Sequence, residues 1–301
     1  MKIDFEDLPH LPTIDLLAKK LVEGFITGLH KSPFHGFSVE FAEHRLYNPG
    51  ESTKHIDWKV YARTDRLYTK QYDEETNLRA YILLDVSSSM FYPAHNNGKI
   101  KFSAIAAASL AYLLQKQRDA VGLITFAERI EKFTEVKSTH GHLMQVFQDL
   151  NEVLNSENEQ KNTSIADNIH LIAEKIHKRS LVIIFSDLIS SNENLDKIFE
   201  SFQHLKHKKH EILFFQVNHL KTELKLDLED QPYEVIDVET GEKLKLNPFE
   251  ARELYQKETE KYFKEIELRC HQYKIDLTKV DIDEDYDQVL SSFLIKRNKL
   301  K

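Results

Sequence analysis

The stretch "YILLDVSSSM" at residues 81–90 joins an apolar run to an aspartate and a series of hydroxyls. Asp85 ends the apolar run, and Ser87 and Ser89 follow two and four residues later. Hydroxyls two residues apart in a tight turn can point to the same side, and Mg²⁺ accepts such oxygens in a near-octahedral shell. The same residue types also cap helices and stabilise turns. By itself, "DVSSS" is more typical of a capped turn, because short motifs match by chance.

Two further residues with oxygen-bearing side chains occur at equivalent junctions of the sequence. The apolar run "SLVIIFSD" ends at Asp187, and "KNTSIADNI" supplies Thr163 just before a helix-like segment. In an open parallel sheet, ligands bind beyond the carboxyl ends of the strands. With these two residues added, we favour a site for Mg²⁺, or Mn²⁺ in its place, over a capped turn. The residues predicted to form it on one rim of the sheet are Asp85, Ser87, Ser89, Thr163 and Asp187.

The elements that must position this rim follow a regular alternation beyond residue 79. Short apolar runs lie at 80–85, 120–126, 180–186 and 211–217. Helix-like segments lie at 99–117, 140–154, 164–178 and 192–207. Because parallel strands need crossover connections, this alternation predicts an α/β fold with a doubly wound, mainly parallel sheet. The segment "ERIEKFTEV" follows the second run too closely for a helical crossover, and it predicts an antiparallel edge strand.

The flanking segments predict two additions to this α/β domain, which we place at 79–301. Residues 1–78 are predicted to hold an amphipathic helix at 12–29 and a β-rich extension. Around "ETGE" two strand-like runs predict a hairpin, and a charged helix follows at 248–272. We interpret 221–272 as an insertion, after which a strand and a helix near the C-terminus complete the sheet.

Polar and aromatic residues within the N-terminal extension allow two interpretations. They form either a recognition surface or a structural cluster, and they are His44, Arg45, Asp57, Trp58 and Arg63. We favour the structural one, with Asp57 and Arg63 as a buried ion pair and Trp58 packed beneath, because large aromatic side chains are mostly buried.

Composition limits the classes of partner. The 301 residues carry a formal net charge of -8, whereas binding a nucleic-acid backbone requires a basic face. Cys270 is the only cysteine, so no intrachain disulfide can form. The start "MKIDFEDLPH" has acidic residues where a signal peptide needs a basic start and an apolar stretch. The longest apolar-rich run, at 104–114, is too short to cross a bilayer. We therefore expect a cytoplasmic protein without membrane insertion.

The residues of the rim also resemble a known motif. "DVSSSM", Thr163 in "NTSIADNI" and Asp187 in "IIFSDL" are together similar to the metal-ion-dependent adhesion site of von Willebrand factor A domains. This resemblance implies that Ser87, Ser89 and Thr163 contact Mg²⁺ directly. It also implies that Asp85 and Asp187 act largely through bound waters.

A wider resemblance runs from about residue 35 to the C-terminus. The segments "EFAEHRLYNPGESTKHIDWKVYARTDRLYTKQYDEE", "DAVGLITF" and "DVETGEKL" resemble the bacterial domain-of-unknown-function family fifty-eight, whose members carry a von Willebrand A-like domain. The chain departs from the family's pattern at "VNHLKTEL", where many relatives have an aspartate-containing segment. The resemblance implies a non-enzymatic adaptor or co-chaperone. Its implied partner is a MoxR-type AAA+ ATPase that contacts the metal through an Asp or Glu.

An enzymatic alternative uses the same aspartate. Dehalogenase-like phosphohydrolases, which depend on Mg²⁺, also present a nucleophilic aspartate at the end of a strand, and Asp85 would take that role. Those enzymes usually carry a second aspartate two residues further on, where this chain has Ser87. "DVSSSM" also lacks the glycines of a serine hydrolase's nucleophile elbow. We therefore expect no catalytic activity.

Overall fold

A computed structural model describes most of the chain. The described residues are 13–31, 44–46, 58–70, 78–93, 98–156, 164–189, 194–229, 231–236 and 243–299. The chain divides into two compact units, one of residues 26–77 and one of residues 1–25 together with 78–301. The larger unit thus contains the beginning of the first helix as well as everything from residue 78 onward.

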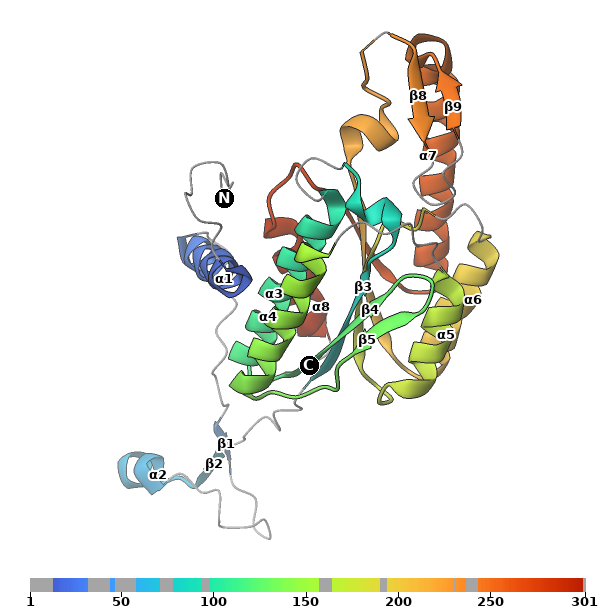
Figure 1. The fold of residues 1–301 in the computed structure, drawn as a ribbon. Coiled ribbons are helices and arrows are strands. Elements are labelled where there is room, and N and C mark those ends of the chain that lie inside the picture. Colours follow the sequence, from blue (N-terminus) through green and yellow to red (C-terminus); the bar gives the residue numbers. More distant parts are fainter. Residues whose placement is uncertain are drawn as a thin grey trace. The chain divides into compact units, whose positions relative to one another are not determined.

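The larger unit is built on a six-stranded sheet with the order β10-β7-β6-β3-β4-β5 (Figure 1). Its strands are β3 (Arg79–Asp85), β4 (Ala120–Phe126), β5 (Ile130–Phe133), β6 (Leu181–Ser186), β7 (Glu211–Asn218) and β10 (Asp276–Asp281). All neighbours pair in parallel except β5, which runs antiparallel to β4 at the edge. The predicted α/β fold, with a mainly parallel sheet and one antiparallel edge strand, is confirmed.

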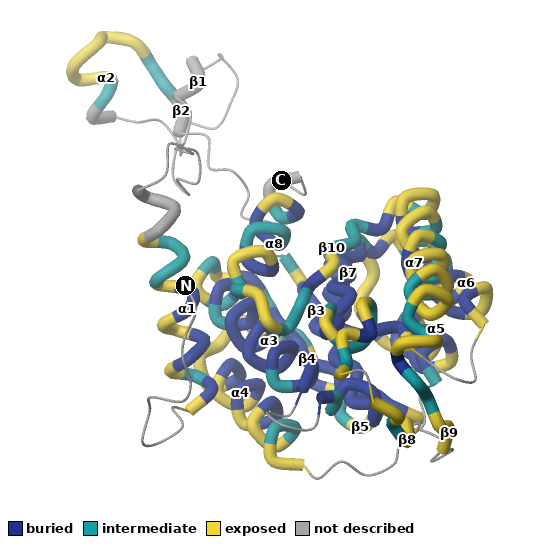
Figure 2. Tube along the Cα trace, turned by 90° about the horizontal axis from the view of Figure 1, so that it is seen from above, coloured by how far each residue is buried: buried dark blue, intermediate teal, exposed yellow. Residues whose placement is uncertain are grey.

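Helices cover both faces of this sheet. They are α3 (Gly98–Lys116), α4 (His140–Asn155), α5 (Ile165–Lys175), α6 (Leu195–His207), α7 (Pro248–Gln272) and α8 (Asp287–Lys299). Figure 1 shows α3, α4 and α8 on one face and α5 and α6 on the other. Since both faces are covered, the central strands are nearly continuous apolar runs, and every residue of β6 is buried. Figure 2 shows β3, β4 and β7 buried between the two helical layers.

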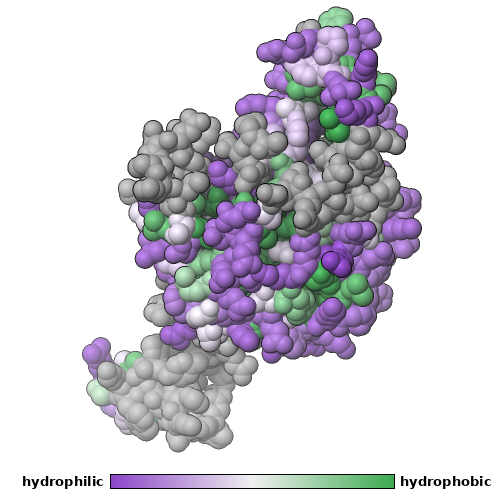
Figure 3. All heavy atoms as spheres, viewed as in Figure 1, coloured by the Kyte–Doolittle hydropathy of each residue, from purple (hydrophilic) through white to green (hydrophobic). Residues whose placement is uncertain are grey.

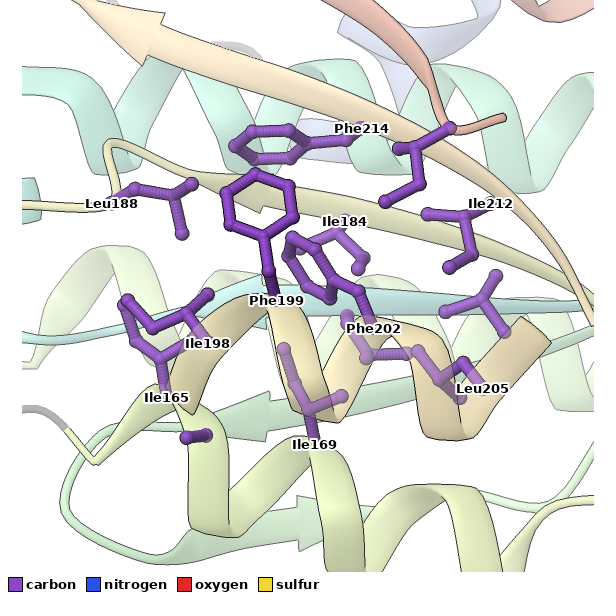
Figure 4. Close-up of a cluster of buried hydrophobic side chains, with 14 of the residues drawn as sticks. Ile165, Ile169, Ile184, Leu188, Ile198, Phe199, Phe202, Leu205, Ile212 and Phe214 are labelled. Atoms are coloured by element: carbon purple, nitrogen blue, oxygen red, sulfur yellow. The ribbon is translucent and has the colours of Figure 1, made fainter. Parts of the chain in front are cut away.

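One hydrophobic core of the described residues lies between the sheet and the layer of α5 and α6. Alternate residues of the strands, such as Ile184 and Phe214, pack against Phe199 and Phe202 of α6 (Figure 4). Phe263, Ile266 and Cys270 of α7 join the same cluster. This packing fixes the C-terminal half of α7 to the sheet, and with it the segment that connects α7 to β7.

The segment after β7 contains a turn and a hairpin before the next long helix. A π-helical turn at Leu220–Leu224 (η4) leads to the antiparallel hairpin of β8 (Tyr233–Ile236) and β9 (Lys243–Leu246), and α7 follows. β10 then pairs in parallel with β7, so the last strand completes the sheet as predicted.

Figure 3 shows a face of the molecule on which hydrophilic side chains predominate. In the part of the chain that is described, no helix has the length and apolarity needed to span a membrane.

The N-terminal segments combine helix and short strands. Helix α1 (Ile14–Lys31) packs Leu17 and Leu21 against Ile105 of α3. In the unit of residues 26–77, β1 (His44–Leu46) pairs antiparallel with β2 (Tyr68–Lys70), and α2 (Trp58–Thr64) lies between them in sequence. The predicted β-rich extension is thus partly helical.

The proposed ion pair in this extension is only partly visible. Arg63 is exposed at the end of α2, which differs from its predicted burial. An arginine on a seven-residue helix reaches solvent readily, because its long side chain needs no partner there. Asp57 lies outside the described residues, as do the side chains of His44, Arg45 and Trp58.

Candidate metal centre

Asp85 ends β3 in a fully buried position. Parallel pairing on both sides, with β4 and β6, places this last residue of the strand at the carboxyl rim of the sheet. The Asp85 side chain is 0% exposed. Its Oδ1 accepts a hydrogen bond from the Ser87 backbone N–H at 3.0 Å, and its Oδ2 accepts one from the Ser186 hydroxyl at 2.7 Å. Both carboxylate oxygens are therefore oriented by neutral donors.

The serines after β3 form a tight turn that brings their hydroxyls together. The Met90 backbone N–H donates to the Ser87 carbonyl at 3.1 Å, and a 3₁₀ turn follows at Ser88–Phe91 (η3). The hydroxyl oxygens of Ser87 and Ser89 are 3.2 Å apart, and both residues are buried. Two ligands on adjacent corners of an octahedral shell lie about 3 Å apart, given Mg²⁺ to oxygen distances of roughly 2.1 Å. The spacing of these hydroxyls suits such a shell.

Asp187 follows β6, and its charge acts on the carboxylate of Asp85. Its Oδ1 accepts a hydrogen bond from the Ile189 backbone N–H at 2.9 Å. Ser186 connects the two strand ends, because its hydroxyl donates to Asp85 and accepts from the Leu188 backbone N–H at 3.0 Å. The structure therefore brings together four of the five predicted site residues.

The fifth predicted residue, Thr163, lies outside the described residues. Its neighbour Ser164 is described, and the Ser164 backbone N–H donates to the carbonyl of Ala127 at 3.1 Å. Ala127 directly follows β4, the strand next to β3. The start of α5 is thus anchored at the same edge of the sheet as Asp85.

Two charged residues of the centre were missed by the sequence reasoning. Lys99, in the first turn of α3, is 0% exposed, and its Nζ donates to Asp187 Oδ2 at 2.7 Å. The same ammonium contacts Glu223, which belongs to the turn η4. Glu223 is also held locally, because its Oε2 accepts from the His219 backbone N–H at 2.7 Å. The charge of the rim therefore depends on Lys99 and Glu223 as well as on the two aspartates.

Burial and charge shape the acidity of these groups. Burial, together with the nearby charge of Asp187, raises the pKa of Asp85 to about 7, in spite of hydrogen bonds from Ser186 and Ser87. Burial by itself would lower the pKa of Lys99, but the charges of Asp187 and Glu223 raise it above its ordinary value. Burial raises the pKa of Glu223, against the opposing charge of Lys99. The pKa of each of these buried groups therefore depends on the charges of its neighbours.

This set of side chains fits a hard divalent cation. When all are ionised, the carboxylates of Asp85, Asp187 and Glu223 and the ammonium of Lys99 leave two net negative charges. A divalent cation would balance them. Among the described residues, no group of three or more His, Cys, Asp or Glu side chains is placed to hold a metal ion. A cation at this rim would therefore depend on the hydroxyls of Ser87 and Ser89, which is the donor chemistry that Mg²⁺ accepts.

The solved structures that match this chain include a conserved hypothetical bacterial protein and a von Willebrand A domain. The protein BatB from Bacteroides thetaiotaomicron is 14% identical, and the alignment covers 74% of this chain and 100% of that one, with a TM-score of 0.45. The SpRpn10 VWA domain is 13% identical, and its alignment covers 48% of this chain and 77% of that one, with a TM-score of 0.36.

Relatives by sequence come from mycobacteria. "Uncharacterized protein Rv1480" of Mycobacterium tuberculosis is 30% identical over 103 residues, which are 34% of this chain and 32% of that protein. "Uncharacterized protein Mb1516" of Mycobacterium bovis aligns with the same figures. The match thus spans about a third (32%) of the length of these curated relatives.

A family model extends the resemblance over most of the chain. The model described as "Protein of unknown function DUF58" matches residues 43–264. This range contains both strand-ending aspartates, the paired serines, Lys99 and Glu223. The resemblance to domain-of-unknown-function family fifty-eight is confirmed, and the chain belongs to the family described as "Protein of unknown function DUF58".

Proposed function

We propose that this chain is a non-enzymatic protein-binding module whose rim holds Mg²⁺. The observation that carries the proposal is the pair of hydroxyls of Ser87 and Ser89, 3.2 Å apart and next to the buried carboxylate of Asp85. When bound, the ion would offer a coordination position to an acidic side chain of another protein. Thr163 is proposed as a third hydroxyl ligand, on the strength of the motif alone.

The hydrogen bonds around the aspartates support this role. Asp85 and Asp187 are each fixed by a backbone N–H two residues further on, at 3.0 and 2.9 Å. Ser186 ties the end of β3 to the loop after β6. The chain therefore holds its oxygen donors in place before any ligand arrives, and a preorganised site loses less conformational entropy on binding.

The proposed partner is a MoxR-type AAA+ ATPase, with this chain as its adaptor or co-chaperone. The family resemblance supports the choice of partner, and the charge of the rim supports the kind of contact. A carboxylate from the partner would complete the shell of a hard cation, which prefers oxygen ligands. We place this complex in the cytoplasm.

The hydrogen bonds of Asp85 speak against the dehalogenase-like alternative. A nucleophilic carboxylate needs a free oxygen, yet Oδ1 of Asp85 accepts from the Ser87 backbone N–H and Oδ2 accepts from the Ser186 hydroxyl. Two residues further on stands Ser87, which cannot replace a carboxylate as general acid and base at neutral pH. We therefore propose binding in preference to catalysis.

A capture experiment tests the proposed function. The intact chain is immobilised, and a MoxR-type ATPase from the same organism is applied with Mg²⁺ or with a chelator. We expect the complex to be lost with chelator and in the double variant Ser87→Ala with Ser89→Ala. Ser88→Ala, which removes a neighbouring hydroxyl outside the predicted ligand set, serves as the control and is expected to bind. Retention of the ATPase by the folded double variant at the level of the control would refute the proposal.

A further inference from the structure

Glu223 reaches the candidate metal centre from a segment outside the parallel sheet. Its side chain is only 13% exposed, and its carboxylate contacts the same Lys99 ammonium as Asp187 Oδ2. Two carboxylates on one ammonium are close neighbours, and the charge of Asp187 raises the pKa of Glu223. The rim therefore already contains an acidic side chain that no strand end supplies.

Side chains of α7 hold the end of the turn that carries Glu223 and the residues after it, while Asp281 and Asp283 hold its beginning through Leu220 and Lys221. The Tyr255 hydroxyl donates to the carbonyl of Glu223 at 2.7 Å, and the Gln256 amide donates to the carbonyl of Lys225 at 2.6 Å. Arg252 donates to the carbonyls of Leu226 and Leu228 at 3.2 and 2.9 Å. The hydrogen bonds of Tyr255 and Gln256 are exposed to solvent, so they compete with water and each contributes only about 0.5–1.5 kcal/mol.

The backbone of this segment is also irregular. The five residues of η4 form a π-helical turn, which is a rare geometry. Two residues after this turn, Leu226 takes a positive φ of 47° although it is not glycine. Such a conformation is unfavourable for a leucine and persists only because the surrounding contacts impose it. The contacts from α7 therefore hold an irregular backbone segment in place directly beside Glu223.

We infer that Glu223 is an internal acidic ligand of the rim, which the acidic side chain of a partner must displace. This inference rests on the proposed function and deepens it. Exchange of one carboxylate for another leaves the charge of the centre unchanged, so Lys99 and Asp187 keep their balance. A basic or neutral side chain would leave the Lys99 ammonium with a single buried carboxylate, which is unfavourable. The partner surface that fits the rim is thus acidic.

Access of a free carboxylate to the rim provides the test. The intact protein is loaded with Mn²⁺, with loading matched between variants by calorimetry, and trifluoroacetate is added as the carboxylate probe. Paramagnetic relaxation of its ¹⁹F signal reports how closely the probe approaches the bound ion. We expect several-fold greater relaxation in Glu223→Gln, which keeps the size of the side chain, and in Glu223→Ala. Asp227→Asn makes the same charge change at an exposed position of the same segment and is expected to match the wild type.

The possible outcomes separate this inference from the proposed function. Equal relaxation in the wild type and both Glu223 variants, with Mn²⁺ bound in each, would overturn the internal ligand and leave the metal site intact. Absence of Mn²⁺ binding by the wild type would overturn both. If the added relaxation in Glu223→Gln disappears when Ser87→Ala and Ser89→Ala are combined with it, the probe is reporting the rim. If it remains with Mn²⁺ still bound, the probe is reporting another site and the inference fails.

Discussion

One aspartate ends β3 and another directly follows β6, yet the fold satisfies the two carboxylates in different ways. Asp85 and Asp187 are both 0% exposed. Asp85 accepts hydrogen bonds from a backbone N–H and a serine hydroxyl, whereas Asp187 is paired with the ammonium of Lys99. The position of an aspartate at the end of a strand therefore does not determine which groups surround its carboxylate. The groups that the fold brings beside it decide whether its charge is balanced from within.

The place of each strand in the sheet explains this difference. β3 lies between β4 and β6, so the end of the strand is surrounded by backbone and by residues of those strands. β6 lies next to β7, and the turn η4 that follows β7 brings Glu223 to the same end. Lys99 joins the two carboxylates there. An ion pair between fully buried groups is unfavourable to break, because the remaining charge is left without a partner in a poorly solvating interior.

Replacement of Lys99 is expected to have the largest effect on stability. Lys99→Met keeps a side chain of similar length but leaves Asp187 and Glu223 as two buried carboxylates without a cation. We expect the free energy of unfolding to fall by about 3–5 kcal/mol, as for other broken buried pairs. Urea unfolding in a metal-free buffer measures it.

The matched control for this change is Lys116→Met, at an exposed position near the end of the same helix. We expect it to alter the free energy of unfolding by less than about 0.5 kcal/mol. Mg²⁺ should restore more stability to Lys99→Met than to the wild type, because the divalent ion supplies the missing positive charge. Similar stability of the two methionine variants would show that Lys99 does not balance the end of β6.

A smaller effect is expected from a matched pair of asparagine variants at the two strand ends. Asp187→Asn removes a charge-assisted hydrogen bond with Lys99, which is worth about 1.5–3 kcal/mol. Asp85→Asn keeps the size of the side chain and a carbonyl acceptor among neutral donors. We therefore expect it to lower the free energy of unfolding by only about 0.5–1.5 kcal/mol. Urea unfolding of both variants without metal provides the comparison. A larger fall in the free energy of unfolding for Asp85→Asn than for Asp187→Asn would contradict the difference that we describe between the two strand ends.

The sequence alone predicts the sheet and the position of the aspartates well. Continuous apolar runs predict the strands β3, which ends at Asp85, and β6, which Asp187 directly follows, and helical spacing predicts α7 at residues 248–272, as observed. These features depend on local pattern, since a buried parallel strand must be apolar on both faces. The short helix α2 escaped prediction, because its seven residues give too little periodicity to distinguish it from a strand.

The charged partners of the rim could not be predicted in the same way. Lys99 stands 88 residues from Asp187 and 124 residues from Glu223 in sequence. Neither "GKIKF" nor "VNHLKTEL" differs in pattern from a solvated helix start or a charged loop. Their burial results from the packing of α3 and η4 at the rim, which no local spacing encodes. The departure from the family's pattern at "VNHLKTEL" was the one signal that pointed to this segment.

Calorimetric titration of Mg²⁺ into the intact protein tests the central claim most directly. We predict that one ion binds to the wild type and to Ser88→Ala, and that Ser87→Ala combined with Ser89→Ala abolishes this binding while circular dichroism shows an unchanged fold. The reason is that the two hydroxyls, 3.2 Å apart, are the neutral oxygen donors that we propose contact the ion directly. Equal binding of Mg²⁺ by the folded double variant and the wild type would contradict the account.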